Sequence, residues 1–304
     1  MFCLLAFIVL GVISVFNAAY RDLAKEAYDC VFRRITLRPC NTGFKEKMQA
    51  KLVGKMLSKS VWAARILNKN FELFSWILFL STILSIFWAG KGLYNFYMYG
   101  SCNGLNQTGF CALDPTGENN KISAAGASCG GGSGDESVVT LEGVDLSLFP
   151  TKQIGAADTV VMIGCFACEY TRKAYPLVKQ LLAEHEANFV FAHYPVKEGM
   201  MDLLDMEYCA EQQNPDLYWQ LIDRLLTMDV AALTDVAQID GVLTELGYDV
   251  AALRACEADP QTTVGVTARR IELEKTNIYG TPLIFINEKG LVGPKPYRVY
   301  ERML

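Results

Sequence analysis

The feature that most limits the fold of this chain is an apolar stretch at residues 73–90 that contains no charged side chain. Its length is close to the roughly 20 apolar residues that span a bilayer. Inside lipid the backbone must satisfy its own hydrogen bonds, so such a segment has to be helical. A second uncharged run covers residues 2–20. We therefore predict transmembrane helices at 1–20 and 71–97, and the alternative for each run is a buried core helix.

Charged residues are distributed unevenly around these two runs. Residues 21–70 hold 12 Lys and Arg against 4 Asp and Glu, whereas residues 101–304 hold 15 against 28. Short loops rich in Lys and Arg stay in the cytoplasm, so we expect 21–70 to be a basic cytoplasmic segment. In a signal peptide the positive charges precede the apolar run, whereas here they follow it. The expected protein is therefore a two-pass protein of the cell membrane with an extracytoplasmic C-terminal domain.

Seven of the ten cysteines follow residue 100, on the predicted outer side, as is typical of an oxidising compartment. Residues 98–150 are polar and Gly-rich, and we expect them to form a flexible extracytoplasmic linker. Within this linker Cys102 and Cys111 close a short loop, which suggests a structural disulfide, and Cys129 is expected to be unpaired.

Cys209 and Cys256 are either a second structural disulfide or two separate buried thiols, because sequence cannot give connectivity. Cys30 and Cys40 lie in the basic segment without a nearby histidine, so a metal site there is not expected. No metal and no cofactor are predicted for any other part of the chain.

Residues 151–304 alternate apolar runs typical of strands with segments of helical periodicity. This pattern predicts an α/β domain in which helices pack on a sheet. A helical region of about 199–275 separates the second strand from the third. The expected strands are 159–163, 188–194 and 283–286, and the expected flanking helices are 168–185 and 296–304.

Cys165 and Cys168 form a Cys-Phe-Ala-Cys motif between an expected strand and an expected helix. At a helix N-terminus the unpaired backbone N–H groups and the macrodipole stabilise a thiolate. The first cysteine of such a pair therefore attacks disulfides, and the second resolves the mixed disulfide. The alternatives are a zinc knuckle or a structural disulfide. Zinc would need two more ligands at matching spacing, and the chain has only two histidines.

A second motif, Gly280-Thr281-Pro282, immediately precedes the strand expected at 283–286. Proline is permitted at a strand entrance because no ladder hydrogen bond is lost there. We predict that the Thr281–Pro282 bond is cis and that Pro282 faces the cysteine pair.

These motifs resemble the DsbA-like branch of the thioredoxin superfamily over roughly residues 150–304. The resemblance implies a thioredoxin-like domain with an inserted helical subdomain, preceded here by two transmembrane helices. It also implies catalytic roles for Cys165 and Cys168 and a substrate-binding role for Thr281 and Pro282. The residues that carry it are Cys165 to Lys173, Tyr208-Cys209-Ala210, Tyr218-Trp219 and Ile278 to Asn287.

Two features depart from this pattern. The dipeptide between the cysteines is Phe-Ala, without the histidine of strongly oxidising members, and the strand before it lacks a buried acid. Proton transfer is left to Asp158, Glu169 or water. We further predict that Cys165 is the more exposed and more acidic thiol of the pair.

Three functions follow from these observations. The first is an enzyme that forms disulfides in exported or cell-surface proteins bearing thiols and is recycled by a membrane redox partner. The second is a reductase or isomerase fed by a membrane electron carrier, because direction depends on redox potential. The third is a non-catalytic thioredoxin-like binding protein or chaperone. The acidic C-terminal region has no basic patch for nucleic acid.

Overall fold

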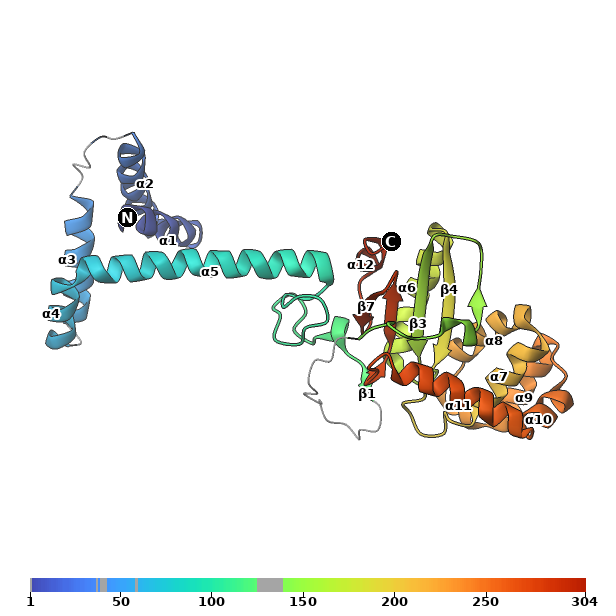
Figure 1. The fold of residues 1–304 in the computed structure, drawn as a ribbon. Coiled ribbons are helices and arrows are strands. Elements are labelled where there is room, and N and C mark those ends of the chain that lie inside the picture. Colours follow the sequence, from blue (N-terminus) through green and yellow to red (C-terminus); the bar gives the residue numbers. More distant parts are fainter. Residues whose placement is uncertain (1, 37, 39–42, 58–59, 125–138) are drawn as a thin grey trace. The chain divides into compact units, whose positions relative to one another are not determined.

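The computed structural model describes residues 2–36, 38, 43–57, 60–124 and 139–304. These residues form two compact units, Met1–Lys91 and Gly92–Leu304. The boundary falls inside one long helix, α5 (Phe71–Tyr99), so each unit is described by itself (Figure 1).

Unit 1 is entirely helical where it is described. Its small core joins Ala6 and Leu10 of the first helix to Leu23, Ala27 and Cys30 of the second. Each contacting position lies three or four residues from the next, which is the spacing of one helix face. The elements are α1 (Phe2–Phe16), α2 (Arg21–Ile35), α3 (Phe44–Leu57), α4 (Val61–Lys69) and most of α5.

Within the part of the chain that the structure describes, α5 is the one helix long and apolar enough to cross a bilayer. Its 29 residues extend about 43 Å at 1.5 Å per residue. The other expected span is not confirmed. The first helix, α1, has 15 residues and ends at Phe16, so it is only about 22 Å long, and a bilayer core is about 30 Å thick.

Unit 2 is built around a five-stranded sheet with the order β2-β4-β3-β6-β7. The two central strands, β3 and β4, are parallel, and α6 (Glu169–Glu184) crosses between them. The remaining pairs are antiparallel, so this is the mixed sheet expected of a thioredoxin-like α/β domain. The strands are β2 (Thr151–Lys152), β3 (Asp158–Gly164), β4 (Ala187–His193), β6 (Leu283–Ile286) and β7 (Lys289–Val292).

Both faces of this sheet are buried, because successive side chains of a strand point to opposite faces. One face packs under α6 and the inserted helices, and it includes Met162, Phe191 and Ile284. The other face, which includes Ile163 and Phe285, packs against the segment before β2 and the end of α11. The continuous apolar runs of β3, β4 and β6 reflect this two-sided burial.

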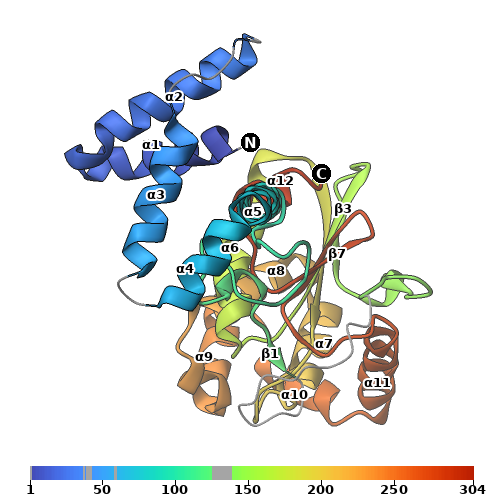
Figure 2. The ribbon, with the colours of Figure 1, turned by 90° about the vertical axis from the view of Figure 1, so that its left-hand side faces the viewer.

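The inserted helices lie between β4 and the proline loop. They occupy nearly the predicted region, since α7 begins at Leu203 and α11 ends at Glu274. Within unit 2, α9, α10 and α11 lie toward one end and α12 (Tyr297–Glu301) toward the other (Figures 1 and 2). The inserted elements are α7 (Leu203–Gln213), α8 (Pro215–Thr227), α9 (Val236–Leu246), α10 (Val250–Glu257) and α11 (Pro260–Glu274).

The hairpin between β6 and β7 is tight. Lys289 of β7 pairs directly with Ile286 of β6. Asn287 and Glu288 alone make the turn, with φ values of 51° and 69°. A two-residue turn with positive φ at both positions matches the twist of the flanking strands.

Residues 100–124 differ most from the prediction of a flexible linker. Cys102 and Cys111 are joined by a disulfide, and Asn106 bonds to the Gly290 carbonyl and the Val292 N–H of β7. Farther along, the buried Lys295 binds the side chain of Asn120. This part of the expected linker is thus held on the domain, because polar side chains within it satisfy backbone groups of the sheet edge. Cys129 lies outside the described residues.

Candidate active site

The cysteine motif forms the turn that joins β3 to α6. Cys168 is the N-cap residue of α6, and its N–H donates to the Cys165 carbonyl at 3.0 Å. The Thr171 hydroxyl accepts from the Cys165 N–H at 3.3 Å. A Cβ at Gly164 would lie only 2.6 Å from the Thr171 side chain, so glycine at this position permits the close packing of the turn.

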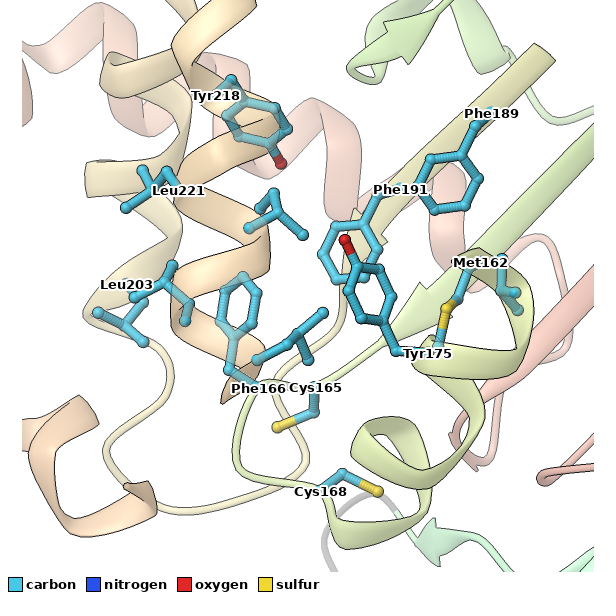
Figure 3. Packing of buried hydrophobic residues seen from close by; sticks show 14 of the residues in the cluster. Met162, Cys165, Phe166, Cys168, Tyr175, Phe189, Phe191, Leu203, Tyr218 and Leu221 are labelled. Carbon is cyan, nitrogen blue, oxygen red and sulfur yellow. The ribbon is translucent and has the colours of Figure 1, made fainter. Parts of the chain in front are cut away.

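Both cysteines of the motif are free thiols, and both are 0% exposed. The prediction that Cys165 is the more exposed thiol is therefore wrong. Both sulfurs are buried because two different parts of the chain cover them: His193 lies beside Cys165, and Ser123 and Thr281 lie beside Cys168. Figure 3 shows both sulfurs at the start of α6, with Phe166 directed away from them toward the helices that carry Leu203 and Leu221.

His193 is the last residue of β4, and it lies beside the motif because it pairs in register with Gly164 of β3. Its ring centroid is 4.3 Å from that of Phe166. Its Nδ1 atom is 2.5 Å from Oε2 of Glu207, a carboxylate carried by α7. Its Nε2 atom is buried and has no hydrogen-bond partner among the described residues. The ring nevertheless interacts electrostatically with the Cys165 thiol.

This arrangement makes Cys165 acidic. Burial alone would raise the pKa of the Cys165 thiol, but the hydrogen bond and the charge of His193 outweigh burial and hold that pKa below its usual value. The backbone N–H groups of Val196 and Ala167 act in the same direction. A thiolate accepts hydrogen bonds, so donors that converge on the sulfur favour the ionised form.

The histidine is charged for a related reason. Burial would lower the pKa of His193, but the charge of Glu207 and the bond to Cys165 outweigh burial and raise that pKa to about 9. Glu207 is itself buried, and its Oε1 atom lies 3.5 Å from the Tyr218 hydroxyl, which donates to it. Glu207, His193 and Cys165 thus form a line of buried groups from the inserted helices to the motif.

The second sulfur has different neighbours. Cys168 Sγ lies 3.3 Å from the Thr281 carbonyl and 3.2 Å from the Ser123 hydroxyl. The Thr281–Pro282 peptide bond is cis, as predicted from the sequence. The structure therefore brings the predicted Thr281 loop to the motif, on the side of Cys168.

Arg172 ties the motif to the inserted helices. Its guanidinium donates to the Phe166 carbonyl at 2.5 Å, to the Met228 carbonyl at 2.5 Å and to the Leu225 carbonyl at 3.0 Å. Hydrogen bonds from a charged donor are among the stronger ones in proteins. The turn that presents Cys165 is consequently anchored to the end of α8.

The acids considered for proton transfer do not lie beside Cys165. Asp158 is at the opposite end of β3, about 20 Å along the strand, where it accepts from the Asn287 side chain. Glu169 is the first residue of α6, exposed to solvent. The buried acid of this site is Glu207 from α7, which was not predicted from the sequence.

The structure contains two disulfides among the cysteines considered for structural pairs. Cys102 is joined to Cys111, and Cys209 of α7 is joined to Cys256 of α10 across 47 residues. The second bond links two inserted helices, and α7 also carries Glu207. Neither bond involves Cys165 or Cys168, so the motif keeps two free thiols that can be oxidised to a disulfide of their own.

His193 could have been found from the sequence. In a strand–helix–strand unit with parallel strands, the carboxyl ends of the two strands meet at one edge of the sheet. A histidine that ends an otherwise apolar strand would then lie next to a motif that follows the other strand. Glu207 and Ser123 carry no such signal, because their approach depends on how the inserted helices and residues 100–124 pack.

Comparison with known proteins gave matches only among solved structures. No family model matches the chain, and no curated protein matches it. A thioredoxin-like oxidoreductase from Silicibacter pomeroyi DSS-3 is 19% identical, with a TM-score of 0.46, and the match covers 51% of this chain and 90% of that one.

Two other solved structures illustrate the same likeness. A periplasmic thioredoxin-like protein from Salmonella enterica serovar Typhimurium is 17% identical, with a TM-score of 0.45 and coverage of 52% and 88%. BdbD from Bacillus subtilis is 16% identical, with a TM-score of 0.43 and coverage of 53% and 91%. At low sequence identity, the structural neighbours of about half of this chain are thioredoxin-like proteins that include DsbA-like thiol–disulfide exchange proteins.

Proposed function

We propose that this chain is a membrane-anchored, extracytoplasmic thiol–disulfide oxidoreductase that forms disulfides in exported or cell-surface proteins. The observation that carries the proposal is the free Cys165–Cys168 pair with the His193–Glu207 pair behind its first sulfur. A structural pair of cysteines would have no need of a buried charge that makes one thiol acidic. Perturbed thiols of this kind cluster at functional sites.

The reaction transfers two electrons from substrate to the cysteine pair. A substrate thiolate attacks Cys165 of the oxidised pair, and a mixed disulfide forms as the Cys165–Cys168 bond breaks. Cys168 takes up a proton and becomes the neutral thiol that can donate to the Thr281 carbonyl. A second substrate thiolate then attacks the substrate sulfur, releases Cys165 as a thiolate and completes the substrate disulfide.

His193 favours the oxidase direction. The released Cys165 thiolate is stabilised by the imidazolium, so the reduced pair is lower in free energy than an ordinary dithiol. When the dithiol form of a pair is stabilised in this way, its disulfide form is a stronger oxidant. A membrane redox partner would then have to withdraw the two electrons. The reductase or isomerase function is the alternative, and it would require a more negative potential.

Substrate docking is proposed for Thr281 and Pro282. The support is positional, since the Thr281 carbonyl lies 3.3 Å from Cys168 Sγ and the backbone of residues 280–281 pairs with an extended segment. A sheet edge of this kind recognises peptides through main-chain hydrogen bonds.

The reduction potential of the full chain in detergent tests the direction. We expect a value above about −200 mV, since protein disulfide isomerase lies near −180 mV and thioredoxin near −270 mV. The potential follows from equilibration with glutathione buffers and mass spectrometry of the alkylated forms. A value near that of thioredoxin would contradict the oxidase proposal and support the reductase. A C165A variant, which cannot form the pair, serves as the control for background exchange.

The membrane topology is a separate part of the proposal. The support is the length of α5 and the excess of basic residues at 21–70. One observation favours the inverted topology instead: Cys30, in the segment 21–70, is disulfide-bonded, and disulfides are rare in the cytoplasm. Intact cells treated with a membrane-impermeant amine reagent decide the matter. We expect labelling at Lys152 and Lys289 and protection of Lys51, and the reverse pattern would mean inverted topology.

A further inference from the structure

A short strand of this chain lies on the edge of the proline loop. β1 (Ser123–Ala124) pairs antiparallel with β5 (Gly280–Thr281), with Ser123 opposite Thr281 and Ala124 opposite Gly280. The two strands form a sheet of their own, apart from the five-stranded sheet. An extended segment that pairs with a sheet edge is also how many domains bind peptides.

β1 also contacts the cysteine pair. The Ser123 hydroxyl lies 3.2 Å from Cys168 Sγ, so the same residue that pairs with Thr281 covers the second sulfur. Although neither cysteine is in a disulfide, both are 0% exposed. A thiol that exchanges disulfides with a protein must be reached by the partner's sulfur. The site is therefore closed in this structure, and β1 is part of what closes it.

The fit of β1 on this edge is close. A Cβ at Gly280 would lie 2.5 Å from the Ser123 carbonyl oxygen and 3.1 Å from the Ala124 Cα atom. Glycine at this position thus allows a backbone to approach that any side chain would hold away. A second extended backbone could not share the edge with β1, because both would need the same hydrogen-bonding groups of Gly280 and Thr281.

The segment before β1 is held in place, whereas the ladder itself is short. Asn119 bonds to the Gly100 carbonyl, Asn120 bonds to the Gln107 carbonyl, and Lys295 binds the Asn120 side chain. The ladder with β5 involves only two residues of each strand. A tethered segment acts at a high effective concentration, of the order of millimolar for a short flexible connection. β1 can therefore stay bound to the β5 edge through weak contacts and still dissociate from it.

We propose that β1 occupies the place of an extended substrate segment, so that substrate and β1 exclude each other at the Gly280–Thr281 edge. This inference rests on the proposed function, because it takes the substrate to be an extended protein segment carrying a thiol or disulfide. No covalent step is involved in the exchange, which replaces the hydrogen bonds of β1 with those of the substrate backbone. β1 thereby limits access to the dithiol until a competing strand is present.

The test substitutes β1 in the full chain. Ala124→Pro removes a backbone donor at the strand and should release β1 from the edge. We expect the reduced dithiol of A124P to react with N-ethylmaleimide at pH 7 at least about tenfold faster than that of the unaltered chain. The matched control is Ala112→Pro, because Ala112 is exposed and is the second residue of the turn closed by the Cys111 carbonyl and the Asp114 N–H, where proline is favoured.

A second experiment adds a free peptide and tests whether it binds the β5 edge that A124P leaves without β1. A synthetic peptide with the sequence of residues 118–124 should slow alkylation of A124P and leave the rate of the unaltered chain unchanged. Equal alkylation rates for A124P and the unaltered chain would overturn the proposal. So would equal acceleration in A112P, which would mean general loosening of the segment.

A second variant keeps the test decisive if A124P fails to fold. Gly280→Ala places a Cβ against the backbone of β1 and should likewise raise the alkylation rate, without altering the segment itself. The alkylation readout needs no turnover. G280A is assessed by alkylation alone, because its Cβ would also hold a substrate backbone away from the edge. Faster alkylation of A124P without disulfide exchange would support the role of β1 and contradict the proposed enzyme function. Disulfide exchange activity together with unchanged alkylation rates would support the enzyme function and contradict the role of β1.

Discussion

The two cysteines of the candidate site are three residues apart in a turn, yet the surroundings of their sulfurs differ in kind. Cys165 faces a buried imidazolium that is paired with Glu207, and backbone donors point at its sulfur. Cys168 faces a carbonyl oxygen and a hydroxyl, both neutral. Hydrogen-bond donors and positive charge favour a thiolate, whereas a carbonyl oxygen can only accept a hydrogen bond from the protonated thiol.

This difference assigns separate tasks to the two sides. The side of His193 is built from β4 and α7, is closed to water and controls the charge on the first sulfur. The side of β1 is built from a two-residue ladder and controls which segment reaches the second sulfur. Acidity and access are thus set by different elements, and substitutions should separate them.

The largest effect is expected for His193→Gln. Loss of the imidazolium removes the main group that lowers the pKa of Cys165, and burial then raises that pKa. Each unit of pKa changes the thiolate fraction about tenfold, and we expect alkylation of Cys165 at pH 6 to slow by about 30-fold. Peptide mapping after a brief pulse of iodoacetamide measures the rate at each cysteine.

The matched control is His185→Gln, since His185 is the only other histidine and lies at the end of α6, away from the motif. Its alkylation rate should equal that of the unaltered chain. In the unaltered reduced chain Cys165 should be labelled before Cys168. Preferential labelling of Cys168 would reverse the proposed roles of the two thiols.

Much of this fold follows from the sequence, because apolar runs and turn residues are local signals. The strand–motif–helix unit and the strand after Pro282 were predicted within one or two residues of their bounds. The charged side of the site was missed, since Glu207 approaches His193 only after α7 packs on the sheet. The closure by Ser123 was missed because a Gly-rich, polar segment gives no periodic signal of burial.

A smaller effect is expected for Glu207→Gln. The uncharged amide no longer raises the pKa of His193, so less imidazolium is present near neutral pH and Cys165 should react about tenfold more slowly at pH 7. In H193Q the Glu207 substitution should add almost nothing, because Glu207 acts through the ring. Additive effects in the double variant would contradict this positioning role.

The same variant makes a prediction about stability and pH. The folded-state pKa of His193, about 9, lies above its unfolded value of about 6.5. Its contribution to stability is therefore fully present below about pH 6.5 and is lost as pH rises toward 9. In the oxidised chain the sulfurs are in a disulfide and carry no charge, so Cys165 no longer raises the pKa of His193. The pH at which this contribution to stability is lost therefore falls below 9.

Urea unfolding of the oxidised chain measures this dependence. The free energy of unfolding should fall between pH 6 and pH 9 by on the order of 1–3 kcal/mol, the typical cost when a buried charged hydrogen bond is lost. E207Q should show little of that slope. An equal slope in E207Q would mean that other groups cause the pH dependence.

The smallest effect is expected for Ser123→Ala. It removes one neutral hydrogen-bond partner of Cys168 and leaves the backbone pairing of β1 intact. Such a bond contributes about 1 kcal/mol, so we expect the reactivity of Cys168 to change by no more than about fivefold, with the pH profile of Cys165 unmoved. The measurement is the same pulse alkylation, resolved by cysteine across pH 5 to 8. If S123A shifted the profile of Cys165 as much as H193Q does, acidity and access would share one control, and the division between the two sides would be wrong.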